Sequence, residues 1–271
     1  MLLRKCKDAI IHKCNKKLVA WLASLYATVR NRRLCLVSNV DHYWVHKHRD
    51  GVLVDLGLCL QTRAELFAAT ADYYNDDYRI RPGDVVFDIG AGIGYETLCF
   101  AAACGPGGKV FSFEAVPSLF FILQQNIARN ALSNVTACNA AISNTCGQIY
   151  FQEMQQHVES RVVFSGGRDN AIDSLTIDRV VEQYGLSAID FVKMNIEGFE
   201  RYAIEGMRHS IDKVRHVSIA CHDFLAERNQ DPNLKTLALV RTFLEDNHFR
   251  CQLRPDDKRP WIAHTISASR A

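Results

Sequence analysis

A glycine-rich run directly after an apolar strand is the segment of the sequence best suited to bind a ligand. Residues 85–89 read VVFDI, and Gly90, Gly92 and Gly94 follow at every second position before a helical pattern begins. In an open α/β sheet, ligands bind at the carboxyl ends of the strands, and glycines let the backbone approach them closely. We therefore expect a cofactor to contact this run: Asp88, Gly90, Ala91, Gly92, Gly94, Tyr95 and Glu96.

The spacing of the glycines distinguishes between cofactors. A dinucleotide-binding loop has the pattern G-x-G-x-x-G, with the pyrophosphate at the N-terminus of the next helix. Here the third glycine comes one residue early, and Tyr95 occupies its expected place. The acid near the strand end, Asp88, also favours a cationic ligand over a pyrophosphate. S-adenosylmethionine carries an ammonium and a sulfonium but no phosphate, so it is the expected cofactor, and a nicotinamide-dependent oxidoreductase is a weaker alternative.

Two further strand ends supply candidate cofactor contacts. Residues 109–113 form a second apolar strand that is followed by Glu114 and Ala115. They lie about twenty residues beyond the glycine loop, where a carboxylate can accept hydrogen bonds from ribose hydroxyls. A third strand is expected over 135–142, and the amide of Asn139 within it either meets the adenine or serves as a turn residue.

Three runs of the sequence resemble the motifs of one family. The runs VVFDIGAGIGYETL, VFSFEAVPS and DFVKMNIEGFE are similar to those of FkbM-type methyltransferases, over roughly residues 80–225. The third run is the specific one, because the first two occur in many methyltransferases. The resemblance implies a Rossmann-like methyltransferase that uses S-adenosylmethionine to methylate hydroxyl oxygens, often on sugars or natural-product scaffolds.

The resemblance also implies roles for individual residues. It places the methionine part of the cofactor on Asp88 and the glycine loop, and the ribose on Glu114. It places four residues after or within the strand over 189–196 near the transferred methyl group: Lys193, Asn195, Glu197 and Gly198. The family commonly has Lys-x-Asp-x-Glu-Gly there, so Asn195 removes one charge and one metal ligand. No metal-ligating residue is therefore assigned, although Glu197 leaves assistance by magnesium open.

Methylation of a hydroxyl calls for a group that removes its proton, because an alcohol is a poor nucleophile. Glu197 is the first candidate for this base, with Asn195 beside it. His222 and Asp223, at the end of the strand over 214–221, are the second candidate, as a histidine base with an orienting carboxylate. Two structural interpretations stay open. Asp223 suits a helix N-cap, and Glu197 suits an acid that closes its loop through backbone N–H groups.

These residues require a particular framework. From residue 83 onward strands and helices alternate, which predicts a doubly wound, mostly parallel seven-stranded sheet. The runs FRCQLR and WIAHTISA then predict an antiparallel edge hairpin at the C-terminus. We expect the methyltransferase domain to span 61–271, beginning with a helix over 61–78. The stretch 165–170 is the best candidate for a mobile loop.

Residues 1–60 form a separate segment of basic character. Residues 1–33 contain nine Lys or Arg and one Asp, whereas the whole chain has a net charge of only +2. An amphipathic helix is expected there, with apolar positions at helical spacing: Ile11, Cys14, Leu18, Trp21, Leu22, Leu25 and Val29. This helix either packs on its own domain or a sister subunit, or lies on a membrane surface. Short strands follow over 34–60. They carry His42, His46 and His48, for which no metal site is expected.

The composition narrows the partners and the compartment. The acidic balance beyond residue 33 argues against a nucleic-acid partner. The cysteines form no C-x-x-C pair, and we expect a reducing, cytoplasmic setting. The N-terminal helix could in addition contact a membrane surface peripherally or form a homodimer. The leading hypothesis is an O-methyltransferase acting on a small molecule, sugar or glycan. The alternatives are a methyltransferase acting on nitrogen or protein, and an inactive binding module, which Asn195 suggests.

Overall fold

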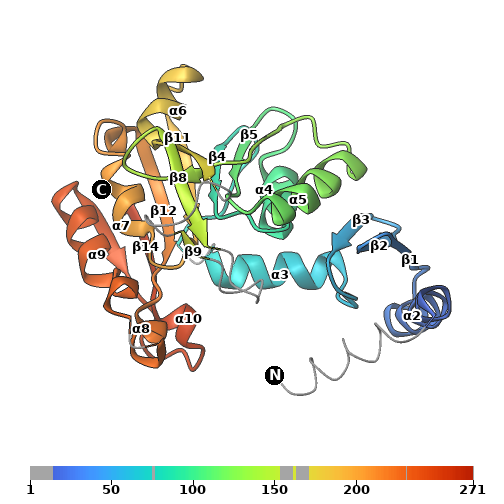
Figure 1. Ribbon diagram of the computed structural model, residues 1–271. Coiled ribbons are helices and arrows are strands. Elements are labelled where there is room, and N and C mark those ends of the chain that lie inside the picture. The colour runs from blue at the N-terminus through green and yellow to red at the C-terminus, as the bar shows by residue number, and fades with distance from the viewer. Residues whose placement is uncertain (1–14, 75–76, 153–160, 163–170, 230, 271) are drawn as a thin grey trace.

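The computed structural model describes residues 15–74, 77–152, 161–162, 171–229 and 231–270. A seven-stranded sheet forms its centre, with the order β13-β14-β12-β11-β4-β5-β6 (Figure 1). Five strands run parallel: β4 (Val85–Ile89), β5 (Lys109–Phe113), β6 (Val135–Cys138), β11 (Ile189–Met194) and β12 (Val214–Ala220). Strands β13 (Phe249–Gln252) and β14 (Thr265–Arg270) complete the sheet and run antiparallel to their neighbours. The predicted doubly wound fold with an antiparallel edge is confirmed.

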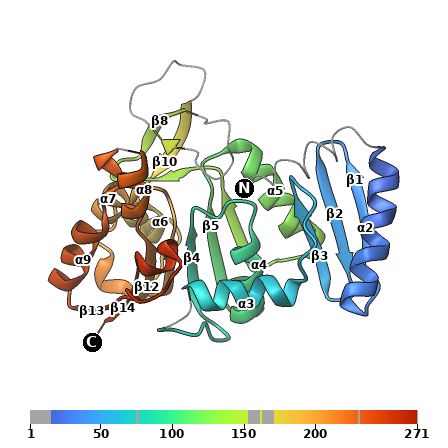
Figure 2. The same cartoon turned by 90° about the horizontal axis from the view of Figure 1, so that it is seen from below.

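Helices cover both faces of this sheet, as its apolar strands require. On one face α6 (Ile177–Gln183), α7 (Glu200–Glu205) and α9 (Leu237–Asp246) bury Phe87, Val192 and their neighbours. On the other face α3 (Arg63–Tyr74) and α4 (Tyr95–Cys104) bury Val86, Val110 and Phe191 (Figure 2). Helix α5 (Pro117–Arg129) follows β5 and contacts β6. Helix α3 is the helix expected over 61–78, and it ends beside the carboxyl edge of the sheet.

The expected third strand over 135–142 is wrong as a single element. It divides into β6 and the short β7 (Ala141–Ile142), which joins a second sheet of order β7-β10-β8-β9. The other strands of that sheet are β8 (Gly147–Gln152), β9 (Arg161–Val162) and β10 (Ala171–Leu175). The chain leaves the main sheet at Asn139, whose side chain bonds to the backbone after β5 instead of continuing the strand. The expected mobile loop at 165–170 lies outside the described residues.

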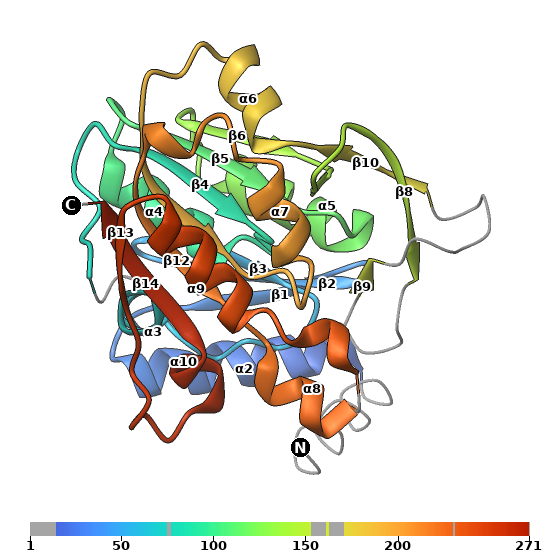
Figure 3. The same cartoon turned by 90° about the vertical axis from the view of Figure 1, so that its left-hand side faces the viewer.

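The C-terminal hairpin also differs in detail from the expectation. Trp261, predicted to open a strand, lies in the short helix α10 (Pro260–Ala263). Pro260 favours this helix because its fixed φ suits the first helical position, where its missing N–H costs little. Strand β14 then enters the sheet between β12 and β13, so β13 forms the edge (Figure 3).

The N-terminal segment forms a layer of its own beside α5. Helix α2 (Lys16–Asn31) packs on an antiparallel sheet of β1 (Leu36–Val40), β2 (Tyr43–His48) and β3 (Gly51–Asp55), and the three strands lie between α2 and α5 (Figure 2). The Asn126 amide of α5 accepts from the Val54 N–H at 2.8 Å and donates to the Val54 carbonyl at 2.9 Å. The edge of β3 is thereby paired with helix side chains, which protects it from other strands.

The described residues contain neither a metal-binding cluster nor a helix that could span a membrane. His42 lies in the turn before β2, and His46 is buried within the strand. Across the described ranges, no three His, Cys, Asp or Glu side chains are grouped to hold a metal ion. Nor does any described helix have the length and apolar character needed to cross a membrane.

Candidate functional site

A cavity of about 460 Å³ lies at the carboxyl ends of β4, β5 and β11, a size typical of small-molecule sites. It sits at the topological switch point, because the chain order runs outward from β4 to β5 and β6 on one side and to β11 and β12 on the other. Most predicted cofactor residues line it: Gly90, Ala91, Gly92, Glu96, Glu114, Ala115 and Asn195. Others do not: Asp88, Gly94, Tyr95 and Asn139. The wall includes residues that the sequence did not indicate: Tyr74, Ile93, Leu119, Ala140, Ile142 and Phe199.

The glycine loop brings backbone to the cavity in a conformation that other residues rarely adopt. Gly90 has a φ of 72° and Gly92 a φ of 55°. A Cβ on Gly90 would lie 2.1 Å from the carbonyl oxygen of Asn195, so this glycine allows the loop to touch the β11 end. A Cβ on Gly92 would meet no heavy atom within 4 Å. The backbone there borders open space, which a bound molecule can fill.

Asp88 supports the loop from below instead of facing the cavity. It is fully buried, and one carboxylate oxygen lies 2.9 Å from the Lys193 ammonium. The other oxygen accepts from the Thr97 hydroxyl at 2.6 Å. Lys193 also donates to the Gly90 carbonyl at 2.7 Å. The Asp88–Lys193 pair therefore joins β4 and β11 and fixes the glycine loop, which corrects the expectation that Asp88 contacts the cofactor directly.

Glu114 occupies the end of β5 and is held in one orientation. Its two carboxylate oxygens accept from the Gly92 N–H at 2.7 Å and the Val116 N–H at 2.8 Å. Burial raises the pKa of Glu114, and these two hydrogen bonds oppose that shift. Each oxygen keeps a second lone pair for a ligand hydroxyl. Asn139, expected near the adenine, instead donates to the carbonyls of Glu114 and Ala115 at 2.8 and 3.2 Å and braces this segment.

The second half of the glycine loop turns toward the N-terminal sheet. A Cβ on Gly94 would lie 2.5 Å from a methyl carbon of Leu123 in α5, so this glycine serves helix packing. The Tyr95 hydroxyl donates to Asp55 at the end of β3 at 2.8 Å. Burial raises the pKa of Tyr95 and keeps the phenol neutral. Both residues were expected at the cofactor, and both lie outside the cavity wall. Glu96 does face the cavity, and burial raises its pKa.

Asn195 meets Tyr74, a cavity residue from a distant part of the chain. The Asn195 amide donates to the Tyr74 hydroxyl at 3.0 Å. Tyr74 is 2% exposed, and burial raises its pKa well above 10, so the phenol stays protonated. At this position the amide of Asn195 donates a hydrogen bond to the phenol oxygen. An aspartate there could only accept a hydrogen bond from the phenol O–H.

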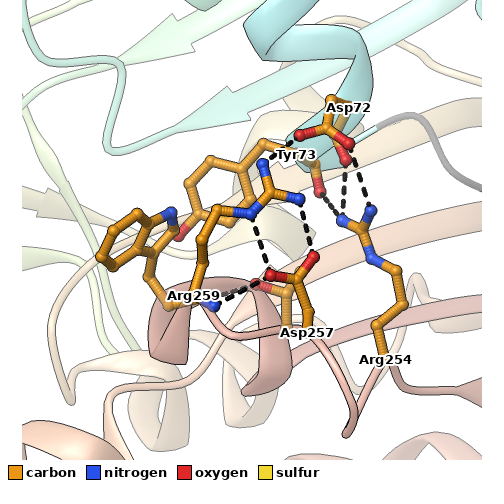
Figure 4. A network of polar contacts seen from close by, with 7 residues as sticks. Asp72, Tyr73, Arg254, Asp257 and Arg259 are labelled. Carbon is orange, nitrogen blue, oxygen red and sulfur yellow. Dashed lines mark hydrogen bonds and ion pairs between the residues drawn. The ribbon is translucent and has the colours of Figure 1, made fainter.

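The end of α3, which carries Tyr74, is held by two arginines from the C-terminal region (Figure 4). Arg254 donates to the backbone carbonyls of Asp72 at 2.7 Å and Tyr73 at 3.1 Å. These carbonyls belong to the last turn of the helix and have no partner within it. Arg259 bonds to the Asp72 carboxylate and to both oxygens of Asp257. The helix end that carries Tyr74 is thus anchored by residues about 180 positions away in the sequence.

A tight loop places Glu197 at the cavity between β11 and α7. Glu197 and Gly198 have φ values of 51° and 96°, which turn the chain sharply after the strand. Glu200, the fully buried first residue of α7, accepts from the Gly198 N–H at 2.9 Å and from the Ile196 N–H at 3.4 Å. Glu200 thus closes this loop through backbone N–H groups, the kind of role also considered for Glu197, and Glu197 lines the cavity.

His222 and Asp223 do not form the base and orienting partner that the sequence indicated. Asp223 accepts from the Thr236 and Leu237 N–H groups at 2.9 and 3.0 Å, so it caps the N-terminus of α9. The Nδ1 atom of His222 lies 3.5 Å from Glu200, which supports the β11–α7 loop. Neither residue lines the cavity. The helix-cap alternative holds for Asp223, although the helix is α9 and not α8 (Asp223–Asn229), which Asp223 itself begins.

Comparison with known proteins identifies the domain that surrounds this cavity. The family model named "Methyltransferase FkbM domain" matches residues 88–251, more than half of the chain. The chain belongs to the FkbM methyltransferase family. The match begins at Asp88 and includes the ends of β4, β5 and β11, so the resemblance in the three sequence motifs is confirmed.

Individual relatives are distant. The hexuronic acid methyltransferase AglP of Haloferax volcanii is 27% identical over 139 residues, which are 51% of this chain and 56% of that protein. The 31-O-demethyl-FK506 methyltransferase FkbM of Streptomyces tacrolimicus is 25% identical over 185 residues, covering 56% of this chain and 70% of the other. The crystal structure of an FkbM methyltransferase from Methylobacillus flagellatus aligns at a TM-score of 0.47 and 18% identity, over 76% of this chain and 58% of that one. The chain thus matches about half the length of AglP.

Proposed function

We propose that this FkbM-family chain is an S-adenosylmethionine-dependent O-methyltransferase that acts on a hydroxyl of a small molecule, sugar or glycan. The observation that carries the proposal is that two carboxylates, Glu114 and Glu197, line one cavity from opposite sides of the switch point. One is suited to a ribose and the other to an acceptor hydroxyl. The names of the two distant relatives, a hexuronic acid methyltransferase and a 31-O-demethyl-FK506 methyltransferase, support this class of acceptor.

The donors and acceptors around the cavity fit S-adenosylmethionine. Glu114 accepts from backbone at both oxygens and keeps lone pairs for the ribose hydroxyls. The open side of Gly92 leaves room for the ligand. Two apolar residues suit a face of the adenine: Ala140, just before β7, and Ile142, within β7. When bound, the cofactor supplies an electrophilic methyl group on a sulfonium.

The residues of this chain then have to orient the acceptor and take its proton. Much of the rate gain in such a displacement comes from positioning, for which effective molarity is worth about 7–11 kcal/mol. Asn195 and Tyr74 form a fixed polar pair on the wall, suited to orient a hydroxyl. Glu197 is our proposed base, because it is the cavity carboxylate on the β11 side. Assistance by magnesium at Glu197 stays open, and turnover measured with added magnesium and with EDTA tests it.

The first experiment is calorimetric titration of the protein with S-adenosylhomocysteine, with NADH in parallel. We expect binding of the former alone. Glu114→Ala should abolish it, whereas Glu182→Ala, at a surface position 73% exposed, should leave it unchanged. The wild type is then assayed for transfer of a radiolabelled methyl group to hydroxylated acceptors, beginning with uronic acids. Absence of binding would overturn the cofactor assignment, and binding without transfer to any hydroxyl would overturn the reaction class.

A further inference from the structure

Helix α2 packs on its own sheet with its small side chains. Ala20, Ala23 and Ala27 are buried against Val37 and Trp44 of the N-terminal sheet. On the same side of the helix, the Ser24 hydroxyl accepts from the Val37 N–H at 2.8 Å and the Thr28 hydroxyl accepts from the Cys35 N–H at 3.0 Å. The helix therefore covers the outer edge of β1 at short range, which only small residues permit.

The large apolar side chains of α2 consequently point away from the protein. Six of them are between 50 and 69% exposed and form what we call the α2 apolar face: Leu18, Trp21, Leu22, Leu25, Tyr26 and Val29. At 3.6 residues per turn they share an arc of about 140° on the helix. The helix does pack on its own domain, as one of the expectations had it, but the alanines make that contact and the apolar stripe opposite them does not. Figure 2 shows α2 at the outer edge of the molecule.

Basic residues flank the α2 apolar face, and no acid lies within the helix. Lys16 and Lys17 begin α2, and Arg30, which pairs with Glu65 of α3 at 2.8 Å, lies in its last turn. Arg32 and Arg33 follow directly and are exposed. The sequence of residues 1–33 contains nine Lys or Arg against one Asp. The face thus combines an apolar stripe with concentrated positive charge, although the chain as a whole is nearly neutral.

We propose that α2 docks on an anionic lipid bilayer, lying in the plane of the interface with the α2 apolar face among the headgroups and upper acyl chains. The combination of a basic border and an apolar stripe with Trp and Tyr is the pattern of helices that bind at this depth. Charge complementarity selects this occupant over a second copy of the chain. A two-fold contact through the same face would bring two basic helices together, and α2 itself contains no acidic residue to pair with the partner's basic residues.

The test is sedimentation of the full chain with vesicles of phosphatidylcholine alone and of phosphatidylcholine mixed with phosphatidylserine. We expect binding to the mixed vesicles that weakens with salt. Leu22→Gln with Leu25→Gln should reduce the partition coefficient at least about tenfold. The matched control is Leu239→Gln on α9, an apolar residue that is 47% exposed and should tolerate the change. Lys17→Gln with Arg33→Gln should reduce binding about twenty-five-fold, since each basic residue near an anionic surface contributes about fivefold.

Tryptophan fluorescence gives a readout specific to the helix. Trp44 is buried and Trp261 of α10 is 45% exposed, whereas Trp21 is 62% exposed and should shift to shorter wavelength on mixed vesicles. Trp21→Phe should remove the shift. Equal binding to both vesicle types, absence of binding, or no effect of the paired leucine substitutions would overturn the proposal. So would a dimer in size-exclusion chromatography that those same substitutions dissociate, because a second copy would then cover the face.

Discussion

Replacement of Lys193 by methionine is the most informative perturbation of the framework below the cavity. The Lys193 and Asp88 side chains are 2% and 0% exposed, and their charged atoms lie 2.9 Å apart. Methionine keeps most of the volume but leaves the Asp88 carboxylate buried without its cation. Removal of one partner from a buried pair typically costs about 3–5 kcal/mol. For a chain of this size each kcal/mol lowers the melting temperature by about 2–4 °C. We therefore expect a fall of about 10 °C.

Differential scanning calorimetry at neutral pH measures this effect, and a double-mutant cycle assigns it. Asp88→Asn combined with Lys193→Met removes both charges, so the double variant should be more stable than the sum of the single losses, by about 2 kcal/mol. Arg179→Met is the control, because its ion pair with Glu182 is 54% and 73% exposed and should contribute under about 1 kcal/mol. A melting temperature of Lys193→Met within a few degrees of the wild type, or strictly additive losses, would refute the reasoning.

Four further outcomes follow from the site and the fold. Glu197→Gln should cut turnover at least about a hundredfold with unchanged cofactor affinity, measured by radiolabel transfer, and near-normal turnover would place the base elsewhere. Glu200→Gln should instead lower the free energy of unfolding by about 2 kcal/mol, seen in denaturant titrations, because an amide nitrogen in place of Oε2 cannot accept from the Gly198 N–H and the Thr236 hydroxyl. Burial lowers the pKa of His46 from 6.5 to about 4, so between these two pH values the unfolded chain binds more protons than the folded one. The free energy of unfolding should therefore fall by about 3 kcal/mol as the pH drops from 6.5 to 4. Denaturant unfolding curves at several pH values measure this dependence, and His46→Gln should weaken it. Arg254→Gln should weaken S-adenosylhomocysteine binding several-fold in calorimetry by loosening the end of α3, whereas Arg241→Gln, in an exposed pair on α9, should not.

The sequence was sufficient for features that depend on local pattern. The glycine run is recognisable because only certain spacings form a tight strand-to-helix turn. Glu114 is recognisable because it directly follows the next strand of the same strand–helix–strand unit. Alternation of apolar strands and helices predicts a parallel sheet because strands buried on both faces need helical crossovers. Chemistry that is local in the chain, such as Glu114 and Glu197 at strand ends, was therefore assigned to the correct edge of the sheet.

Tertiary structure decided what each side chain does at that edge. Lys193 reaches Gly90 across 103 positions of sequence, and Asn195 reaches Tyr74 across 121, through strand and helix neighbours that no local pattern encodes. The same is true of Asp223, which caps α9 at Leu237 and not the helix it begins. For α2 the sequence predicted the apolar stripe, but the direction it points depends on which face fits the sheet. The alanine face approaches β1 more closely than leucines could, and that fit turned the apolar stripe outward.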